Sequence, residues 1–237
     1  MKSNYLFVAL LINSLFSFAQ IIDETFEFEG ATRMHKVYLP ANFSDNSPLV
    51  LNLHGYTSNA FQQVFYTNMN AVAEENDFVV VFPDGTTDQY GITFWNSEIL
   101  GESVNDLGYL EALIDSMILN YNIDPNRVYM CGMSNGGFMS YYSACELSDR
   151  IAAIASVTGT MNNAILDNCN PERAVPVLEI HGTADGTVPY NGASSTGSFQ
   201  TMMPIEEVVD FWVNHNNCML ESELELEDIS TSDMSTV

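Results

Sequence analysis

The sequence predicts an α/β fold built around a mostly parallel sheet. Continuous apolar stretches of strand length alternate along the chain with stretches in which apolar residues recur at helical spacing. The chain has 237 residues, a length that suits one large domain better than two. Hydrophobic residues make up 46% of it, which supplies a sizeable core and excludes a disordered composition.

The expected elements follow one another without an internal repeat or a low-complexity linker. Residues 25–29 and 34–39 are predicted to form two antiparallel edge strands. Later apolar runs predict buried strands, at residues 49–53, 78–82, 128–131, 151–157 and 175–180. Helical spacing predicts helices, at residues 61–73, 110–121, 138–145 and 205–213. Apolar strands separated by helices indicate a sheet that is covered on both faces.

The first residues have the pattern of a leader peptide. Lys2 provides a positive start, residues 5–12 are nearly all apolar, and Ser17-Phe18-Ala19 is a small-x-small cleavage pattern. These features predict a secretory signal peptide over residues 1–19, followed by one domain over residues 20–237. The apolar run is short for a membrane span, and a retained anchor is the alternative. We therefore expect a secreted protein with no stable membrane insertion after cleavage.

The charge balance is strongly acidic. There are 31 acidic and 6 basic residues, which give a formal net charge of −25. Such a surface repels nucleic acid and anionic membranes, so neither is expected as a partner. The charge indicates high solubility, or attraction of cationic partners, and says little about the reaction.

A glycine-flanked serine is the strongest candidate for chemistry. The apolar run 128–131 leads into Gly132-Met133-Ser134-Asn135-Gly136, and a stretch with helix character follows. A strand, a tight turn with serine and a helix together make a nucleophile elbow, in which the glycines leave room for a strained turn. The alternative is a structural glycine-rich turn. We expect Ser134 to be the nucleophile.

The cysteines indicate disulfide chemistry in an exported protein. There are four of them, Cys131, Cys145, Cys169 and Cys218, and four cysteines allow three connectivities. Cys145 and Cys169 follow the helix after Ser134 and the next strand–loop unit, so we expect these two to pair. No cysteine or histidine spacing is that of a metal site, and we expect neither a metal nor another cofactor.

Several separate segments, in order, resemble the secreted poly(3-hydroxybutyrate) depolymerase family. The segments are LHGY, NMNAVAEENDFVVVFPDG, WN, IDPNRVYMCGMSNGGF and HGTADGTVPYNG. This family overlaps the feruloyl and acetylxylan esterases of the α/β-hydrolase group, and the resemblance covers about residues 33–218. It implies an α/β-hydrolase fold and ester hydrolysis by a Ser-His-Asp triad.

The resemblance also implies roles for individual residues. Asp185 matches the triad acid, although it is also a possible turn aspartate before Gly186. The backbone N–H groups of Tyr56 and Asn135 match the oxyanion hole. His54 and Trp95 match positions beside the substrate.

Two of these matches have structural alternatives. His54 sits in the oxyanion loop and is expected to be structural rather than catalytic, and Trp95 is almost as well explained as a core residue. Asp106 is expected to be a helix N-cap, with a role as an alternative triad acid as its rival.

The sequence departs from the family at the triad histidine. The family carries this histidine in a GGGHxWPG-like segment after a further strand, and no such segment occurs here. His215, His181 and His35 are each in the wrong place for the base. The expectation is therefore a domain that is incomplete at its C-terminus, lacks the last strand and helix, and is weak or inactive alone.

The expected function is secreted carboxylic-ester hydrolysis. The substrate would be a polyester or an esterified plant polysaccharide, and the sequence does not decide between them. The alternatives are a serine peptidase of the same fold and a non-catalytic polymer- or carbohydrate-binding module.

Overall fold

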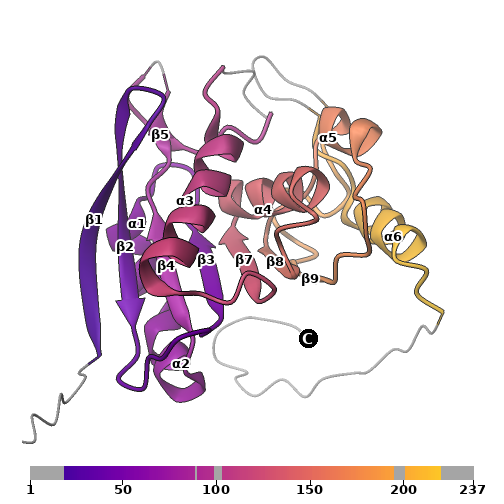
Figure 1. Ribbon diagram of the computed structural model, residues 1–237. Coiled ribbons are helices and arrows are strands. Elements are labelled where there is room, and N and C mark those ends of the chain that lie inside the picture. Colours follow the sequence, from indigo (N-terminus) through magenta and orange to yellow (C-terminus); the bar gives the residue numbers. More distant parts are fainter. Residues whose placement is uncertain (1–18, 89, 99–102, 195–200, 220–237) are drawn as a thin grey trace, which may run out of the picture.

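A seven-stranded sheet organises the part of the protein that the structure describes (Figure 1). The computed structural model describes residues 19–88, 90–98, 103–194 and 201–219. The strand order is β1-β2-β4-β3-β7-β8-β9. These strands are β1 (Gln20–Phe28), β2 (Ala31–Leu39), β3 (Leu49–Leu53), β4 (Val79–Pro83), β7 (Val128–Met133), β8 (Ala153–Val157) and β9 (Val177–Ile180).

The strand directions place the loops that follow β3, β7, β8 and β9 at one edge of the sheet. Strands β4, β3, β7, β8 and β9 run parallel, while β1 and β2 form an antiparallel hairpin that pairs with β4. The carboxyl ends of β3, β7, β8 and β9 therefore meet at the same edge, where α/β sheets bind ligands. This is the α/β-hydrolase fold that the sequence predicts, including its antiparallel edge strands.

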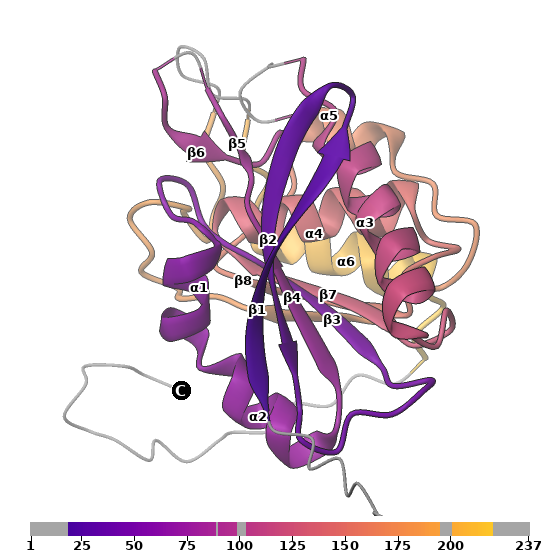
Figure 2. The same ribbon diagram turned by 60° about the vertical axis from the view of Figure 1, so that its left-hand side comes forward.

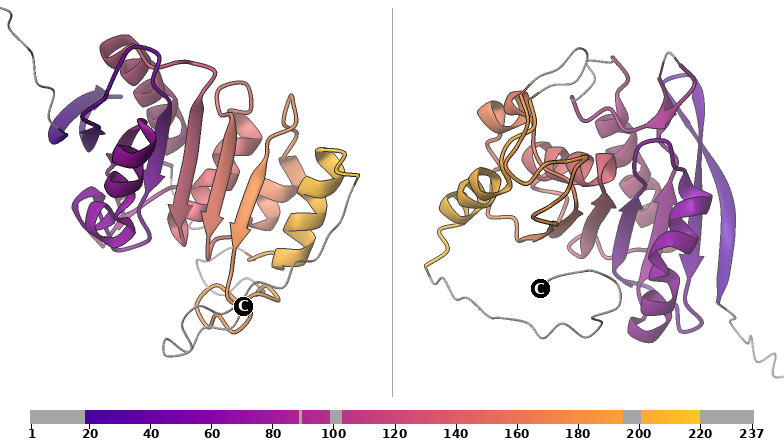
Figure 3. Two further views of the ribbon diagram at one scale, coloured as in Figure 1. Left: turned by 90° about the horizontal axis from the view of Figure 1, so that it is seen from below. Right: turned by 180° about the vertical axis from the view of Figure 1, so that it is seen from behind.

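Helices cover both faces of the sheet, as predicted. They are α1 (Ala60–Thr67), α2 (Met69–Asn76), α3 (Asp106–Tyr121), α4 (Asn135–Glu146), α5 (Asn163–Asn168) and α6 (Ile205–His215). The main core joins one face of the sheet to α3, α4 and α6, and a smaller cluster packs α1 and α2 on the other face. Figure 3 (left) shows α1 and α2 on one side of the strands and α4 on the other.

The structure corrects three details. The single helix expected at residues 61–73 is two helices, because Asn68 adopts the left-handed conformation with φ 48° between them. Between the strand expected at residues 78–82 and the helix expected at residues 110–121, the structure has a small hairpin of β5 (Thr86–Thr87) and β6 (Thr93–Phe94), visible above the sheet in Figure 2. The six-residue helix α5 is too short to show a helical pattern in the sequence.

One disulfide fastens the outer part of the domain. Cys145, in α4, is bonded to Cys169, the residue after α5, as the sequence analysis expected. Cys131 and Cys218 are free in the described part of the chain. Within that part, no helix has the length and apolar character needed to cross a membrane. The expected leader lies almost entirely outside the described residues.

Candidate active site

Ser134 occupies a strained turn between β7 and α4. Its φ is 53° and its ψ is −119°, a backbone conformation that residues with a side chain rarely adopt. Its N–H donates to the Val157 carbonyl at 2.8 Å, and its own carbonyl accepts from Gly137 and Phe138 at 2.8 and 3.0 Å. The turn is therefore fixed to β8 on one side and starts α4 on the other, which is the geometry of a nucleophile elbow.

Close backbone approaches explain the glycines that flank the serine. A Cβ atom on Gly136 would lie 2.4 Å from the carbonyl oxygen of Leu53, at the end of β3. A Cβ atom on Gly132 would lie 2.3 Å from backbone atoms of Gly136 itself. Both distances are far below van der Waals contact, so only glycine lets the elbow sit this close to β3.

The loop after β3 reaches the nucleophile. A Cβ atom on Gly55 would lie 3.6 Å from Cβ of Ser134, so the two backbones are neighbours. The loop is anchored to the small hairpin, because Thr57 N–H donates to the Thr93 carbonyl at 2.9 Å and the Tyr56 hydroxyl donates to Asp88 at 2.9 Å. The expected oxyanion-hole residues, Tyr56 and Asn135, thus belong to two segments that meet beside Ser134.

The side chain of Asn135 has a structural role that the sequence analysis missed. Its Oδ1 accepts from the Trp95 N–H at 2.6 Å, and its Nδ2 donates to the Trp95 carbonyl at 3.0 Å. It also donates to the Ser97 hydroxyl at 3.3 Å. The side chain of Asn135, the first residue of α4, therefore binds both the N–H and the carbonyl of Trp95. These two hydrogen bonds hold the loop after β6.

The burial of His54 and Trp95 favours the structural alternative for both residues. Both side chains are fully buried and their rings are 5.1 Å apart. His54 Nε2 accepts from the Gly85 N–H at 2.9 Å while its Nδ1 lies 2.8 Å from the Gly55 carbonyl, which fixes the neutral Nδ1–H tautomer. Trp95 donates its indole N–H to the His54 carbonyl at 3.1 Å. The pair is a rigid support under the oxyanion loop, and burial lowers the pKa of His54.

Asp185 lies in the loop that follows β9, at the same sheet edge as Ser134. One carboxylate oxygen accepts from the N–H groups of Thr187 and Val188 at 2.7 and 2.9 Å. The other lies 3.9 Å from His181 Nε2, which is too far for a hydrogen bond. The side chain is thus oriented by its own turn and leaves one oxygen without a close contact to His181.

A buried network behind Asp185 was also missed. Glu179 Oε1 lies 2.9 Å from His181 Nδ1, and Glu179 Oε2 accepts from the Tyr141 hydroxyl of α4 at 2.8 Å. His181 Nε2 donates to the Val188 carbonyl at 2.8 Å, which closes the loop that carries Asp185. Burial raises the pKa of Glu179. No sequence signal marked Glu179, because a single acidic residue within a strand is usually read as a solvent-facing position.

None of the histidines is joined to Ser134 by a hydrogen bond in the described residues. His54 and His181 use both ring nitrogens elsewhere, as described above. His35 contacts Glu24 at 3.2 Å, on the far strand pair β1–β2. His215 stacks on Phe211 at the end of α6 and lies 3.3 Å from the Arg173 carbonyl. The sequence-based rejection of His181, His215 and His35 as the base agrees with these contacts.

Asp106 serves neither of the roles expected for it. The N-cap of α3 is Asn105, whose side chain accepts from the Gly108 N–H at 3.0 Å. Asp106 is fully buried, bonded to Arg33 at 2.7 Å and to the Asn96 N–H at 2.8 Å. Burial raises its pKa, and the Arg33 guanidinium opposes that rise. Both carboxylate oxygens are occupied, so Asp106 has no free oxygen for a triad histidine.

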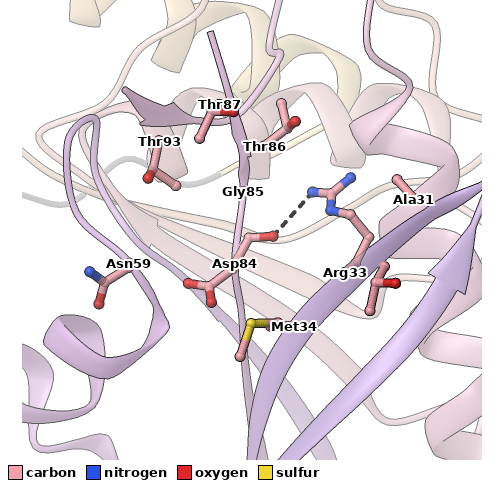
Figure 4. A pocket seen from close by; sticks show the side chains of 10 residues that line it. Ala31, Arg33, Met34, Asn59, Asp84, Gly85, Thr86, Thr87 and Thr93 are labelled. Carbon is pink, nitrogen blue, oxygen red and sulfur yellow. Dashed lines mark hydrogen bonds between the residues drawn. The ribbon is translucent and has the colours of Figure 1, made fainter. Parts of the chain in front are cut away.

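A cavity of about 340 Å³ opens between the start of β2 and the small hairpin (Figure 4). Polar side chains dominate its lining: Thr32, Arg33, Asn59, Asp84, Thr86, Thr87 and Thr93. Asp84 is held in place because its carboxylate accepts from the Ala60 N–H at 2.5 Å. The described residues contain no group of three or more His, Cys, Asp or Glu side chains that could hold a metal ion.

These features define a serine hydrolase-type site on an α/β-hydrolase sheet. The chain belongs to the phospholipase/carboxylesterase family, whose model matches residues 40–231. It is 35% identical over 162 residues to a bifunctional acetylxylan esterase/xylanase, XynS20E, of Neocallimastix patriciarum. It is 31% identical over 189 residues to feruloyl esterase B of Piromyces equi.

The matches cover only part of the length of each relative. The first covers 68% of this chain and 23% of the relative, and the second covers 77% and 35%. The chain thus spans about a quarter to a third of the length of these relatives. An S-formylglutathione hydrolase of Agrobacterium tumefaciens has a similar structure, with a TM-score of 0.60, 14% identity and 86% of each chain covered. At that identity the likeness concerns the fold alone.

Proposed function

We propose that this chain is the catalytic domain of a secreted serine carboxylic-ester hydrolase. The observation that carries the proposal is the left-handed conformation of Ser134 on a turn between strand and helix, with the Gly55 loop beside it. A structural turn gains nothing from that strain, whereas a nucleophile gains an exposed hydroxyl and neighbouring N–H donors. Membership of the carboxylesterase family supports the same reading.

In the proposed reaction the Ser134 hydroxyl attacks the ester carbonyl. Its proton passes to a histidine base, and the N–H groups of Tyr56 and Asn135 stabilise the oxyanion that forms. The alcohol then leaves with that proton, and water hydrolyses the acyl-enzyme by the same steps. Asp185 orients the histidine through the carboxylate oxygen that its own turn does not use.

None of the four histidines takes the place of the triad base beside Ser134. His54 and His181 are fixed by other partners, and His35 and His215 lie on other elements. A Ser134 without a base keeps only binding and the oxyanion hole. We therefore expect the rate of this chain to be about 10⁴–10⁶-fold below that of a complete triad.

The names of three relatives support an ester of a large polymer as the substrate. The names of two relatives denote acetylxylan and feruloyl esterases, and a third is a poly(3-hydroxyalkanoate) depolymerase of Paucimonas lemoignei, 30% identical over 133 residues. We propose the same class here, an esterified plant polysaccharide or a polyester. A secreted enzyme, as the leader expected at residues 1–19 implies, would meet such polymers outside the cell.

The test is hydrolysis of p-nitrophenyl acetate and butyrate. This chain is compared with a version that carries any residues encoded after Val237, and each is compared with its Ser134→Ala variant. Activity that is low in this chain, high in the longer version and lost without Ser134 supports the proposal. Equal activity in both that is abolished by His215→Ala would assign the base to His215. Full turnover by folded Ser134→Ala protein would refute the proposal.

A further inference from the structure

The cavity between the start of β2 and the small hairpin has no part in the proposed reaction. Its volume of about 340 Å³ falls at the lower end of the range for small-molecule sites, about 300–1,000 Å³. Strand β2, the end of the loop before α1 and the hairpin all contribute to its wall (Figure 4). The cavity is therefore built by three segments of the chain, and its chemistry indicates what it can bind.

Asp84 gives the cavity a hydrogen-bond acceptor in a fixed position. Its backbone N–H donates to the Met34 carbonyl at 2.9 Å, and its own carbonyl accepts from Arg33 Nη2 at 3.1 Å. One carboxylate oxygen accepts from the Ala60 N–H at 2.5 Å, and no described residue donates to the other. That second oxygen is open to an O–H or N–H donor of a ligand.

The cavity also offers donors. Arg33 is only 7% exposed, and its hydrogen bonds to the Asp84 carbonyl and to Asp106 both use Nη2. No described residue accepts from its Nη1 or Nε groups, although the side chain lines the cavity. The Asn59 side chain caps α1 with its oxygen, which leaves its amide N–H groups for a ligand.

Hydroxyl groups complete the lining. Three threonine hydroxyls from the hairpin can each donate and accept, and no described residue bonds to them: Thr86, Thr87 and Thr93. A ligand that satisfies this cavity must therefore supply both donors and acceptors.

Charge and chemistry exclude most other ligands. An anion would meet a chain with a net charge of −25, and an organic cation would lie against the Arg33 guanidinium. The described residues contain no group of three or more acidic, histidine or cysteine side chains for a metal ion. A polyester segment has ester acceptors but no donor for Asp84. A sugar ring is neutral, and its hydroxyls both donate and accept.

The cavity lies within reach of Ser134. The loop between them runs from Gly55, whose backbone neighbours Ser134, to Asn59 in the cavity wall. Four residues span at most about 14 Å. Thr93 of the wall also holds this loop, because its carbonyl accepts from the Thr57 N–H at 2.9 Å. The distance suits a short oligomer that occupies the cavity and the nucleophile together.

We propose that this cavity binds one neutral sugar ring, whose hydroxyls donate to Asp84 and accept from Arg33 and the threonines. The binding depends on the cavity alone. Its consequence for the reaction rests on the proposed function: the substrate is then an esterified polysaccharide rather than a polyester, with the ester of a nearby sugar residue at Ser134.

Titration calorimetry with xylotriose and cellotriose tests the proposal, beside a methyl-capped trimer of 3-hydroxybutyrate. We expect saturable binding of at least one sugar trimer and no binding of the polyester trimer. The variant Thr86→Val/Thr93→Val removes two hydroxyls, keeps the side-chain shape and should weaken sugar binding about tenfold. The matched control Thr25→Val, on an exposed position of β1, should not change it.

Asp84→Asn is the second cavity variant. Its amide oxygen can still accept from the Ala60 N–H, but the free acceptor becomes a donor. We expect sugar binding to weaken about tenfold here too. Denaturant unfolding shows which variants are folded, and either folded cavity variant decides the test.

Three results would overturn the sugar site. They are no binding of either sugar trimer, binding that a folded cavity variant leaves unchanged, and displacement of the sugar by the polyester trimer. Esterase assays separate this inference from the proposed function. Ser134-dependent hydrolysis of p-nitrophenyl acetate by the longer version, without sugar binding, would refute only the sugar site. Sugar binding without such hydrolysis would support the sugar site and refute only the proposed function.

Discussion

The two halves of the candidate site are built differently. The nucleophile half, which consists of β7, Ser134, α4 and the Gly55 loop, is held by backbone contacts so close that only glycine fits at Gly136. The acid half follows edge strand β9 and is held by the side chains of Glu179 and His181. On β9 Leu178 is 55% exposed and Ile180 is 52% exposed.

This difference predicts how well each half of the site tolerates a substitution. A backbone contact leaves no room for a side-chain change, so the nucleophile half has one geometry. A loop held by side-chain hydrogen bonds at a sheet edge has a lower local stability. We therefore expect substitutions to be costly at the nucleophile half and mild at the acid half.

The largest effect is expected from Gly136→Ala. The new methyl group would lie 2.4 Å from the Leu53 carbonyl oxygen, so β3 and α4 must move apart. Alanine favours a helix by about 1 kcal/mol over glycine. We expect the clash to outweigh this gain and lower the free energy of unfolding by more than about 3 kcal/mol.

Denaturant unfolding measures this effect, with Gly182→Ala as the matched control in the acid half. A Cβ atom on Gly182 would meet nothing within 4 Å, so the control should change stability by less than about 0.5 kcal/mol. Equal costs at the two glycines would mean that the two halves are packed alike.

The disulfide should have the next largest effect. Cys145 and Cys169 are 24 residues apart. Removing a disulfide that closes a loop of that size raises the entropy of the unfolded chain and lowers the free energy of unfolding by about 3 kcal/mol. The double variant Cys145→Ser/Cys169→Ser should therefore unfold at lower denaturant concentration. Cys218→Ser, at an exposed free thiol, is the control and should unfold with the unchanged chain. A double variant as stable as the control would show that packing alone holds α4 and α5 together.

A smaller effect on the free energy of unfolding is expected when the pH is lowered, because His54 is then protonated. Burial lowers the pKa of His54 in the folded protein, so below an unfolded value of about 6.5 the unfolded chain binds more protons. The stability that His54 contributes is complete above that pH and is lost as the pH falls toward the folded pKa. The free energy of unfolding should thus decrease on acidification by up to about 1.4 kcal/mol per pH unit from this group.

Comparison with His54→Gln isolates this contribution. Burial also lowers the pKa of His35 and raises the pKa values of Asp106 and Glu179, but these groups are present in both proteins. The variant should show a shallower dependence of stability on pH between about 6.5 and 5. Parallel curves would mean that His54 is protonated without cost and is not the rigid support described above.

The sequence predicted the nucleophile half better than the acid half. Glycine spacing around Ser134 reports backbone geometry directly, since only a close approach or a strained turn requires glycine there. The sequence left two positions open for both His54 and Trp95, because a residue beside an active-site loop has the same pattern whether it faces the substrate or supports the loop. The pair Glu179–His181 was hidden for a related reason, since alternation along a strand does not say which face is covered.

The smallest effect is expected from Asp185→Asn. Only one carboxylate oxygen accepts from Thr187 and Val188, and an amide oxygen can accept the same two hydrogen bonds. We expect a loss of less than about 1 kcal/mol by denaturant unfolding, and a larger loss for Asp185→Ala, which removes the acceptor. A loss above about 2 kcal/mol for the asparagine variant would mean that the charge itself holds the loop, as expected for a turn aspartate. A small loss of stability would mean that the fold does not need the negative charge of Asp185, because an amide replaces it. The carboxylate would then be available for the triad.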